Sequence, residues 1–406
     1  MTAATRSNWL ASLFSNQPTS APTQKKHLEG SRVYMVSPGQ PVWTDRDYEK
    51  FAREAYIQNV VAHRCIGLIT QAAATVKLQA HQTNRRGGCK EITQHPILDL
   101  LKNPNPLMTG PQFLESIYHY RLISGNAFIT AIAPEDTPPQ ELHLLRPDRV
   151  HVVAGKGGVP MSYRYTVNDK TTNYAVNPIN GESTILHIKN FHPTNDWYGL
   201  SPIEAAAYSI DQHNQSAAWN QSLLQNGARP SGALIVKANE QFGGNLSEDQ
   251  YSRIKTQIDE QFSGHENAGR PILLEGGLEW KEMSLTPKDM DFVEAKNSAA
   301  RDIALAFGVP PQLLGIPGDN TFSNLQEARL SLWEQTVLPL VESTISSLSN
   351  WLTAHFDTRI TLTPNIESIT ALASRNQIIW DRLEKASFLS DDEKREAVGY
   401  GKCGEV

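Results

Sequence analysis

Three side chains that could perform acid–base or metal chemistry lie close together in the sequence, namely His187, His192 and Asp196. Their spacing matches no zinc-ligand pattern, so we expect no metal site there. The common catalytic motifs are also missing: the chain has no GxxxxGKS/T, HExxH or GxSxG, and no GxGxxG follows a predicted strand. A hydrolase or nuclease that uses His192 and Asp196 is kept as an alternative function. The main interpretation is a protein that is not an enzyme and needs neither a cofactor nor a metal.

The composition is that of a globular chain of 406 residues, 39% hydrophobic and 20% charged, with length for two or three subdomains. Its 37 basic and 43 acidic residues give a net charge of −6, whereas a sequence-specific nucleic-acid binder normally carries a basic face. Cys65, Cys89 and Cys403 form neither a disulfide framework nor a CxxC pair, which suits a reducing cytoplasm. Residues 1–11 do not resemble a secretory signal, and no apolar run of about 18 residues predicts a membrane span.

The stretch 286–352 predicts two helices joined by a short loop, and the rest of the chain is organised around it. Thr286 caps the first helix, a proline occupies its first position, and Gly308 ends it. The second helix covers 325–352, where apolar residues recur at helical spacing. Pro339 lies within the second helix and should kink it, because proline removes one hydrogen bond of the helical ladder.

The loop between these helices, residues 312–324, is rich in Gly, Pro and Asn yet contains four large apolar side chains. These side chains are Leu313, Leu314, Ile316 and Phe322. One interpretation is that they pack into the core of the subunit itself, since connecting segments are usually surface links. The other is that the loop touches a partner. Capped helices on both sides would act as rigid arms and concentrate motion in the loop.

The remaining pattern predicts an α+β fold. Residues 1–45 are rich in Ser, Thr, Gln, Pro and Gly and predict a flexible N-terminal arm. Further helices are predicted at 47–75, 110–124, 202–225, 246–262, 366–384 and 391–398. Strands are predicted at 127–133, 142–153, 162–167, 184–191, 233–236, 271–275, 278–283 and 359–362.

The helix 202–225 begins with Ser201 as its cap, and Glu204 completes a capping box. Its middle, 211–216, is polar and nearly uncharged, whereas a solvated helix usually carries Lys and Glu. Such a helix suits packing beside identical copies, or lining a channel without binding the molecule that passes through it. An ordinary surface helix is the alternative. The strand–helix–strand insertion 229–283 that follows has short exposed edges, which invite pairing with a neighbouring subunit.

Several segments, taken in order, resemble the portal proteins of tailed bacteriophages and prophages. They are HPILDLLKNPNPLMTGPQFLESIYHYRLISGNAFITAI, ELHLLRPDRVHVV, WYGLSPIEAAAYSI, LLQNGARPSGALIV and IALAFGVPPQLLGIPGDNTFSNLQEARLSLWEQTVLPLVESTISSLSNWL. The resemblance spans about Asp47 to Tyr400. No single motif decides it, but the ordered set is fairly specific.

The resemblance implies the phage portal fold, with wing, stem, clip and short crown regions assembled as a ring around a central channel. It divides the chain into an arm (1–45), a wing (46–200), stem helix one (201–228), a clip (229–285), stem helix two (286–311), a tunnel loop (312–324), a long wing helix with a return strand (325–363), and a crown with the C-terminal tail (364–406).

The implied function is a dodecameric ring at a unique capsid vertex, through which double-stranded DNA is packaged and ejected. The implied partners are the terminase large subunit at the clip, the major capsid and scaffold proteins around the wing, and the head–tail adaptor, with no membrane. The protein would be made in the bacterial host cytoplasm and end in the virion. A head–tail adaptor, or another structural virion protein without a DNA channel, is the further alternative, and its native mass would be small.

Two sets of site residues follow from the resemblance. The tunnel loop would meet DNA at the narrowest part of the channel through Leu313, Leu314, Ile316, Asn320, Thr321 and Phe322. The clip would dock the terminase or adaptor through Arg229, Tyr251, Arg253, Lys255 and Arg270. Catalytic, cofactor and metal residues are expected to be absent.

Overall fold

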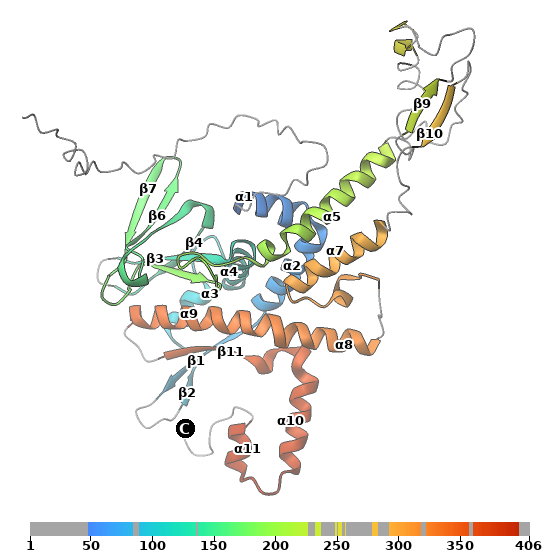
Figure 1. The fold of residues 1–406 in the computed structure, drawn as a ribbon. Helices are drawn as coiled ribbons and strands as arrows, with labels where there is room; N and C mark the ends of the chain where they lie inside the picture. Colours follow the sequence, from blue (N-terminus) through green and yellow to red (C-terminus); the bar gives the residue numbers. More distant parts are fainter. Residues whose placement is uncertain are drawn as a thin grey trace, which may run out of the picture. The chain divides into compact units, whose positions relative to one another are not determined.

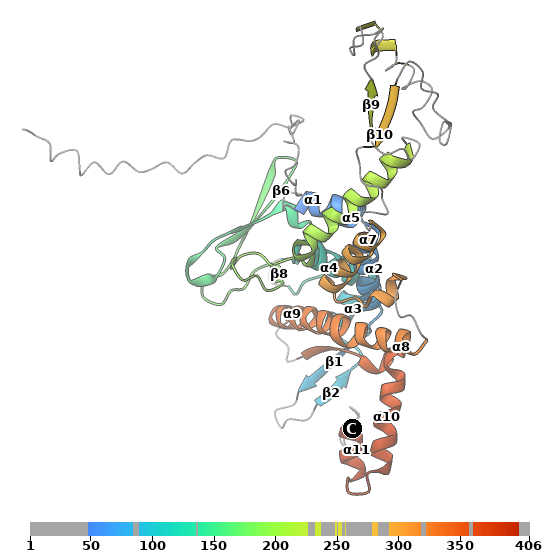
Figure 2. The same cartoon turned by 45° about the vertical axis from the view of Figure 1, so that its right-hand side comes forward.

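The computed structural model describes residues 48–83, 89–134, 137–225, 232–236, 248–249, 251–253, 256, 278–282, 292–317, 322–356 and 360–397. The chain divides into two compact units, Met1–Val42 and Trp43–Val406, and every described residue belongs to the second. The predicted arm, the predicted strand 271–275 and the predicted cap Thr286 therefore lie outside the described residues. Figures 1 and 2 show the described helices and strands.

The N-terminal helices differ from the single helix predicted at 47–75. The chain forms α1 (Tyr48–Lys50) and the π-helical η2 (Phe51–Ile57), and then α2 (Val60–Ala74) begins after a break. The break occurs because Asn59 is extended (φ −91°, ψ 111°) and its side chain caps α2 by accepting hydrogen bonds from Val61 N and Ala62 N. A polar side chain inside an apparently continuous helical pattern therefore marks a helix start.

The helix predicted at 110–124 is confirmed as α4 (Gly110–Ser124), which follows the short α3 (Pro96–Lys102). Thr109 and Gln112 form a capping box at its start. Gly125 ends it in the left-handed conformation, with φ 75°. The helix packs against α2 and leads directly into β3 (Asn126–Ile132), so the chain turns from helix to strand at one glycine.

Two antiparallel three-stranded sheets follow. One has the order β4-β3-β8, with β4 at Glu141–Leu145 and β8 at Ile185–Lys189. The other has the order β5-β6-β7, with strands Val150–Val153, Ser162–Val167 and Lys170–Ala175. The single strand predicted at 142–153 is wrong, because Pro147 opens a 3-10 turn between β4 and β5 and cannot donate to a ladder. Strand β7 was not predicted; Asn168 and Asp169, both with positive φ, make the tight turn that returns it to β6.

A third sheet has the order β11-β1-β2 and joins distant parts of the chain. Strands β1 (Leu78–Thr83) and β2 (Cys89–Ile92) were not predicted, whereas β11 (Ile360–Pro364) confirms the strand expected at 359–362. Leu78 pairs with Pro364 in the antiparallel register. This pairing ties the residues after α2 to those after the long C-terminal helix.

The long helix predicted at 325–352 is confirmed, and it extends from 322 to 356 as α8 (Phe322–Ser331), η7 (Leu332–Val337) and α9 (Leu338–Phe356). At the predicted kink the structure has a π-helical turn, in which Leu338 N donates to the carbonyl of Trp333. The turn lies immediately before Pro339, which cannot donate to the ladder. The buried side chains of α9 include Val341, Ile345, Leu348 and Leu352.

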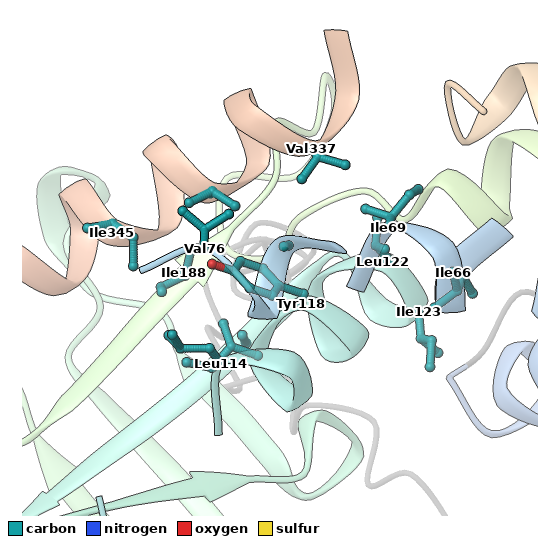
Figure 3. Close-up of a cluster of buried hydrophobic side chains, with 14 of the residues drawn as sticks. Ile66, Ile69, Val76, Leu114, Tyr118, Leu122, Ile123, Ile188, Val337 and Ile345 are labelled. Atoms are coloured by element: carbon teal, nitrogen blue, oxygen red, sulfur yellow. The ribbon is translucent and has the colours of Figure 1, made fainter. Parts of the chain in front are cut away.

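The main hydrophobic core lies between the long helix, α2, α4 and the β4-β3-β8 sheet. Figure 3 shows Tyr118 and Leu114 of α4 beneath Ile345 of α9, with Val76 and Ile188 beside them. The Tyr118 side chain is fully buried, and burial raises the pKa of its hydroxyl above the ordinary value. A smaller cluster forms around Phe128 and Tyr163, between the β4-β3-β8 sheet and the β5-β6-β7 sheet.

The C-terminal residues form two 3-10 turns and two helices. The turns are η8 (Ile366–Ser368) and η9 (Thr370–Leu372), and the helices are α10 (Ala373–Lys385) and α11 (Asp391–Ala397). The continuous helix predicted at 366–384 is wrong in its first half because Ile369 is extended and buried against the main core. The capping box at Ser390 is confirmed.

A further two-stranded antiparallel sheet is formed by β9 (Gly232–Val236) and β10 (Leu278–Glu282), both close to prediction. Within the described part of the chain no helix is long and apolar enough to cross a membrane.

Candidate functional site

Helices α5 (Pro202–Gln225) and α7 (Phe292–Ala306) lie side by side, as both views show (Figures 1 and 2). The start of α5 is held by Ser201, whose Oγ accepts from Ile203 N at 3.0 Å and donates to the carbonyl of Leu122 at 2.9 Å. The buried side chains of the pair are mostly small or β-branched: Ile203, Ala206, Ala207, Ile210, Ala299, Ala300, Ile303 and Ala304. Small side chains allow the two helix axes to approach closely.

The polar middle of α5 has a structural role that the sequence did not show. Asn59 is almost fully buried, and its Nδ2 donates to Asn214 Oδ1 at 2.9 Å and to His213 Nδ1 at 3.3 Å. The Nδ2 of Asn214 in turn donates to the carbonyl of Glu54 at 2.9 Å. One asparagine therefore caps α2 and holds α5. Burial, and then the charge of Lys296, lower the pKa of His213, which agrees with an Nδ1 that accepts a hydrogen bond.

Beyond Ser216 the character of α5 changes. Residues 217–219, 221 and 222 are all exposed, and the segment AAWNQS from 217 to 222 carries no charge. On α7, Val293 and Leu305 are also exposed although both are large and apolar. The helix pair thus exposes an uncharged segment of α5 and two large apolar side chains of α7, beside the exposed charged residues Glu294, Arg301 and Asp302 of α7.

The end of α7 is fixed to the long helix. Gly308 has φ 66°, and its carbonyl accepts a hydrogen bond from Thr336 Oγ1 at 2.7 Å. A Cβ at Gly308 would lie 2.6 Å from that same Oγ1, so only glycine fits here without a rearrangement. The glycine predicted to end this helix is therefore also the contact point with η7.

The predicted tunnel loop divides into two parts. Its first part includes η6 (Pro311–Leu314), where Leu313 and Leu314 are partly buried against the main core, and Ile316 is only 9% exposed. The carbonyl of Pro317 accepts a hydrogen bond from Arg301 of α7. For Leu313, Leu314 and Ile316 this burial favours the interpretation that they pack within the subunit.

The other predicted loop contacts, Asn320 and Thr321, lie outside the described residues, as does the side chain of Phe322. In the predicted clip, Tyr251 and Arg253 are exposed. Arg229, Lys255 and Arg270 also lie outside the described residues. The structure therefore brings none of the clip residues together with the loop residues in a described contact.

The histidine that could have performed chemistry has a packing role. His187 on β8 stacks on Phe128, with ring centroids 4.1 Å apart, and its Nε2 donates to Asn126 Oδ1 at 3.0 Å. Burial, with a smaller contribution from Lys189, lowers the pKa of His187 to about 3, so the ring is neutral at physiological pH. The half-buried ring therefore packs against its neighbours in the sheet.

His192 and Asp196 belong to a short connection after β8 that is held by local hydrogen bonds. His192 Nδ1 accepts from Thr194 N at 3.1 Å, and the backbone carbonyl of Asp196, rather than its carboxylate, accepts from Lys189. In the described ranges, no three His, Cys, Asp or Glu side chains are placed to hold a metal ion. Burial raises the pKa of the Cys65 thiol to about 12, so Cys65 is not a reactive thiolate.

Sequence reasoning missed Arg121, the buried cation of α4. Its guanidinium donates to Asn190 Oδ1, Ser343 Oγ, Thr344 Oγ1 and the carbonyl of Leu340, all neutral acceptors. Burial lowers its pKa. The only sequence signal was an arginine at an otherwise apolar position of the predicted helix 110–124.

The chain belongs to the phage portal protein family, whose model matches residues 60–399. An uncharacterized protein of Rickettsia bellii (strain RML369-C) is 47% identical over 349 residues, which cover 86% of this chain and 88% of the relative. The portal protein of Enterobacteria phage HK97 is 25% identical over 308 residues, or 74% of this chain and 68% of that protein.

Solved structures from GTA (gene transfer agent) particles are similar to this chain over most of its length. A chain in the neck of an empty GTA particle is 43% identical, with a TM-score of 0.68, over 90% of this chain and 96% of its own length. The corresponding chain in the neck of a native GTA particle, computed with C12 symmetry, is 42% identical with a TM-score of 0.67. This protein therefore has the α+β portal fold, and its family is structural rather than enzymatic.

Proposed function

We propose that this portal protein forms a ring of about twelve subunits at one vertex of a phage-like particle, and that double-stranded DNA passes through the ring during packaging and ejection. The main support is the 42% identical chain in a particle neck computed with C12 symmetry, which covers 90% of this chain. A ring of identical chains needs two different contact surfaces on each copy, because its contacts run head to tail. The exposed apolar side chains of the α5–α7 pair supply candidate contact surface.

The net charge of the chain favours a channel through which DNA slides over one that binds DNA tightly. Twelve copies with a net charge of −6 each would carry −72. Double-stranded DNA carries one negative charge per ~1.7 Å, and a basic bore would bind its phosphates and release their counterions. The exposed segment of α5, residues 217–222, is uncharged and could line a bore through which DNA slides.

We propose that residues 312–324 form the tunnel loop of this channel. Because Leu313, Leu314 and Ile316 pack at the base of the loop, contact with DNA is proposed for Asn320, Thr321 and Phe322. In this assignment the apolar ring of Phe322 would cushion the duplex without binding phosphates. The neighbouring regions keep the roles stated above: 46–200 as wing, 201–228 and 286–311 as stem helices, 229–285 as clip, 325–363 as long wing helix and 364–406 as crown.

The proposed partners follow from this arrangement. The terminase large subunit docks on the clip, where Tyr251 and Arg253 are exposed. Major capsid and scaffold proteins surround the wing, and a head–tail adaptor binds the ring from outside. The portal itself turns over no ATP and cuts no DNA; the motor supplies the energy. The protein is made in the host cytoplasm and becomes part of the virion.

The full-length protein tests this proposal through its mass and shape. Native mass spectrometry should give a species of about twelve times 45.1 kDa, and class-averaged electron micrographs should show a ring with a central hole. A monomer or small oligomer at all concentrations and salts, even with scaffold or capsid protein added, would favour the adaptor alternative. ATP turnover that follows the protein peak on gel filtration would contradict the non-enzymatic assignment.

A further inference from the structure

We propose that helix α10 packs between two neighbouring copies of this chain, and that its apolar side chains form a subunit contact of the assembled ring. The inference rests on the proposed ring. The observation that carries it is a run of three large apolar side chains that stay exposed: Ile378 is 53% exposed, Ile379 36% and Trp380 50%. Phe388, just after the helix, is 84% exposed.

The three consecutive positions matter more than the total apolar area. Successive residues of an α-helix point about 100° apart, because the helix has 3.6 residues per turn. A helix that lies on one partner surface buries a single stripe at spacings of three and four residues. Ile379 and Trp380 lie four and three residues before Leu383 and form one apolar stripe with it, whereas Ile378 lies on the other side of the helix, beside Arg382 and Lys385. Large apolar side chains are therefore exposed on two sides of α10, and a single flat partner does not cover both sides.

The contacts of α10 with the described part of the chain leave much of this apolar surface exposed. The principal contacts of α10 within the described chain are with the adjacent turn η9, whose Leu372 is buried in the main core. Figures 1 and 2 show α10 and α11 extending away from the long helix. A large apolar surface of this kind in a soluble protein marks an interaction site.

The charges of α10 favour a second copy as the occupant. Ile378, Arg382 and Lys385 form one row at spacings of four and three residues, and this row is cationic. Asp381 and Glu384 form the neighbouring anionic row with Gln377. In a head-to-tail contact, the cationic row of one copy meets the anionic row of the next. An unrelated partner would not require both signs on one helix.

Two variants with reversed rows test the contact. In the first, Arg382→Glu and Lys385→Glu make the cationic row acidic; in the second, Asp381→Arg and Glu384→Arg make the anionic row basic. Each variant alone faces like charges at every contact, and we expect at least a tenfold rise in the protein concentration needed for half assembly, measured by sedimentation velocity. An equimolar mixture restores opposite charges at each contact and should assemble near the wild-type concentration.

A third variant, Ile378→Ser with Ile379→Ser, tests the apolar part and should weaken assembly in the same assay. Its circular dichroism and melting temperature at concentrations where wild type is monomeric should be unchanged, because both side chains are solvent-exposed in the single subunit. A matched control reverses an exposed ion pair on the N-terminal helix, Glu49→Arg with Arg53→Glu, and should assemble like wild type.

The outcomes separate the two proposals. If wild type forms rings and all α10 variants assemble equally well, the α10 contact is wrong and a capsid or scaffold protein covers this helix instead. If the Ser variant loses helicity as a monomer, its isoleucines belong to the subunit core and the contact is also wrong. If wild type forms no ring under any condition, the proposed function itself fails.

Discussion

Arg121 and Asn190 hold each other by hydrogen bonds in both directions. Arg121 Nε and Nη2 donate to Asn190 Oδ1 at 3.2 and 2.9 Å, and Asn190 Nδ2 donates to the backbone carbonyl of Arg121 at 3.1 Å. Asn190 Nδ2 also reaches the carbonyl of Leu200, just before α5, at 3.2 Å. The same guanidinium contacts Ser343 and Thr344 on α9. This pair therefore joins α4, the long helix and the chain that enters α5.

Replacing Arg121 by alanine should destabilise the subunit strongly. The change leaves Asn190 Oδ1 and Thr344 Oγ1 short of a donor in a buried site, and unsatisfied buried groups cost about 1–3 kcal/mol each. We expect the free energy of unfolding in urea to fall by about 2–4 kcal/mol. Arg53→Ala, which removes an exposed arginine, is the control and should cost less than about 0.5 kcal/mol. Equal losses for the two variants would show that the Arg121 network contributes little.

Asn59 allows the helix cap and the bridge to α5 to be separated. Asn59→Ala removes both, and Asn59→Ser keeps a side-chain oxygen that can cap α2 but removes the Nδ2 donor to Asn214 without burying a charge. Loss of a cap costs about 0.5–2 kcal/mol, and loss of the bridge should add about 1 kcal/mol. Urea unfolding should therefore rank wild type above Ser and Ser above Ala. If Ser is as unstable as Ala, the cap contributes nothing measurable.

His187 predicts a pH dependence of stability. Its pKa is about 3 in the folded protein and about 6.5 unfolded. The unfolded state therefore binds more protons between these values, and stability falls as the pH drops below 6.5. The slope for one such group is at most about 1.4 kcal/mol per pH unit. Unfolding measured at pH 7 and pH 5 should show a smaller loss for His187→Phe than for wild type, by up to about 2 kcal/mol.

The control for that measurement is His151→Phe, because the His151 side chain is exposed on β5. It should leave the difference between pH 7 and pH 5 as in wild type. His213, whose pKa is also lowered by burial, acts in the same direction and remains in every variant. A pH dependence unchanged by His187→Phe would mean that the buried ring does not resist protonation.

Ile316 tests the assignment of the loop base. Because the Ile316 side chain is only 9% exposed, Ile316→Ser should lower the free energy of unfolding by about 2–4 kcal/mol. Leu107→Ser, at an exposed position, should change it by less than about 0.5 kcal/mol. If Ile316→Ser melts like wild type yet particles package less DNA, the side chain faces the channel after all.

The long helices were predictable because their signals are local and repeated. Pro202 to Gln225 was predicted to the residue, since the proline begins the segment and the cap Ser201 and the terminal Asn-Gly lie directly beside it. Pro339 predicted a local disturbance, and the structure shows its form as a π turn. Short strands such as β1 and β2 contain too few residues for a period to show, and the partner of β1 in the sheet, β11, lies almost 300 residues away along the chain.

The candidate site was only partly predictable, because burial is a property of the folded neighbours. Leu313 and Ile316 could be partner contacts in a Gly- and Pro-rich loop, but Leu313 is partly buried against the subunit core and Ile316 is only 9% exposed. Asn59 gave no signal and Arg121 only a weak one, since a polar residue on a helix is usually solvated and only the packed partners of these two residues show otherwise. The identity of the chain was accessible because many weak segment resemblances occur in one order over 60–399.

Gly125, at the end of α4, and Gly199, just before α5, approach each other so closely that this junction limits evolution. A Cβ at Gly125 would lie 2.4 Å from the carbonyl oxygen of Gly199, and a Cβ at Gly199 would lie 2.2 Å from the carbonyl oxygen of Gly125. Each obstacle is backbone, so no side-chain substitution elsewhere can remove it. Neither position can drift to alanine before the other, and changing both makes the crowding worse. The two positions are therefore closed to mutation as a pair for as long as a lineage keeps this junction.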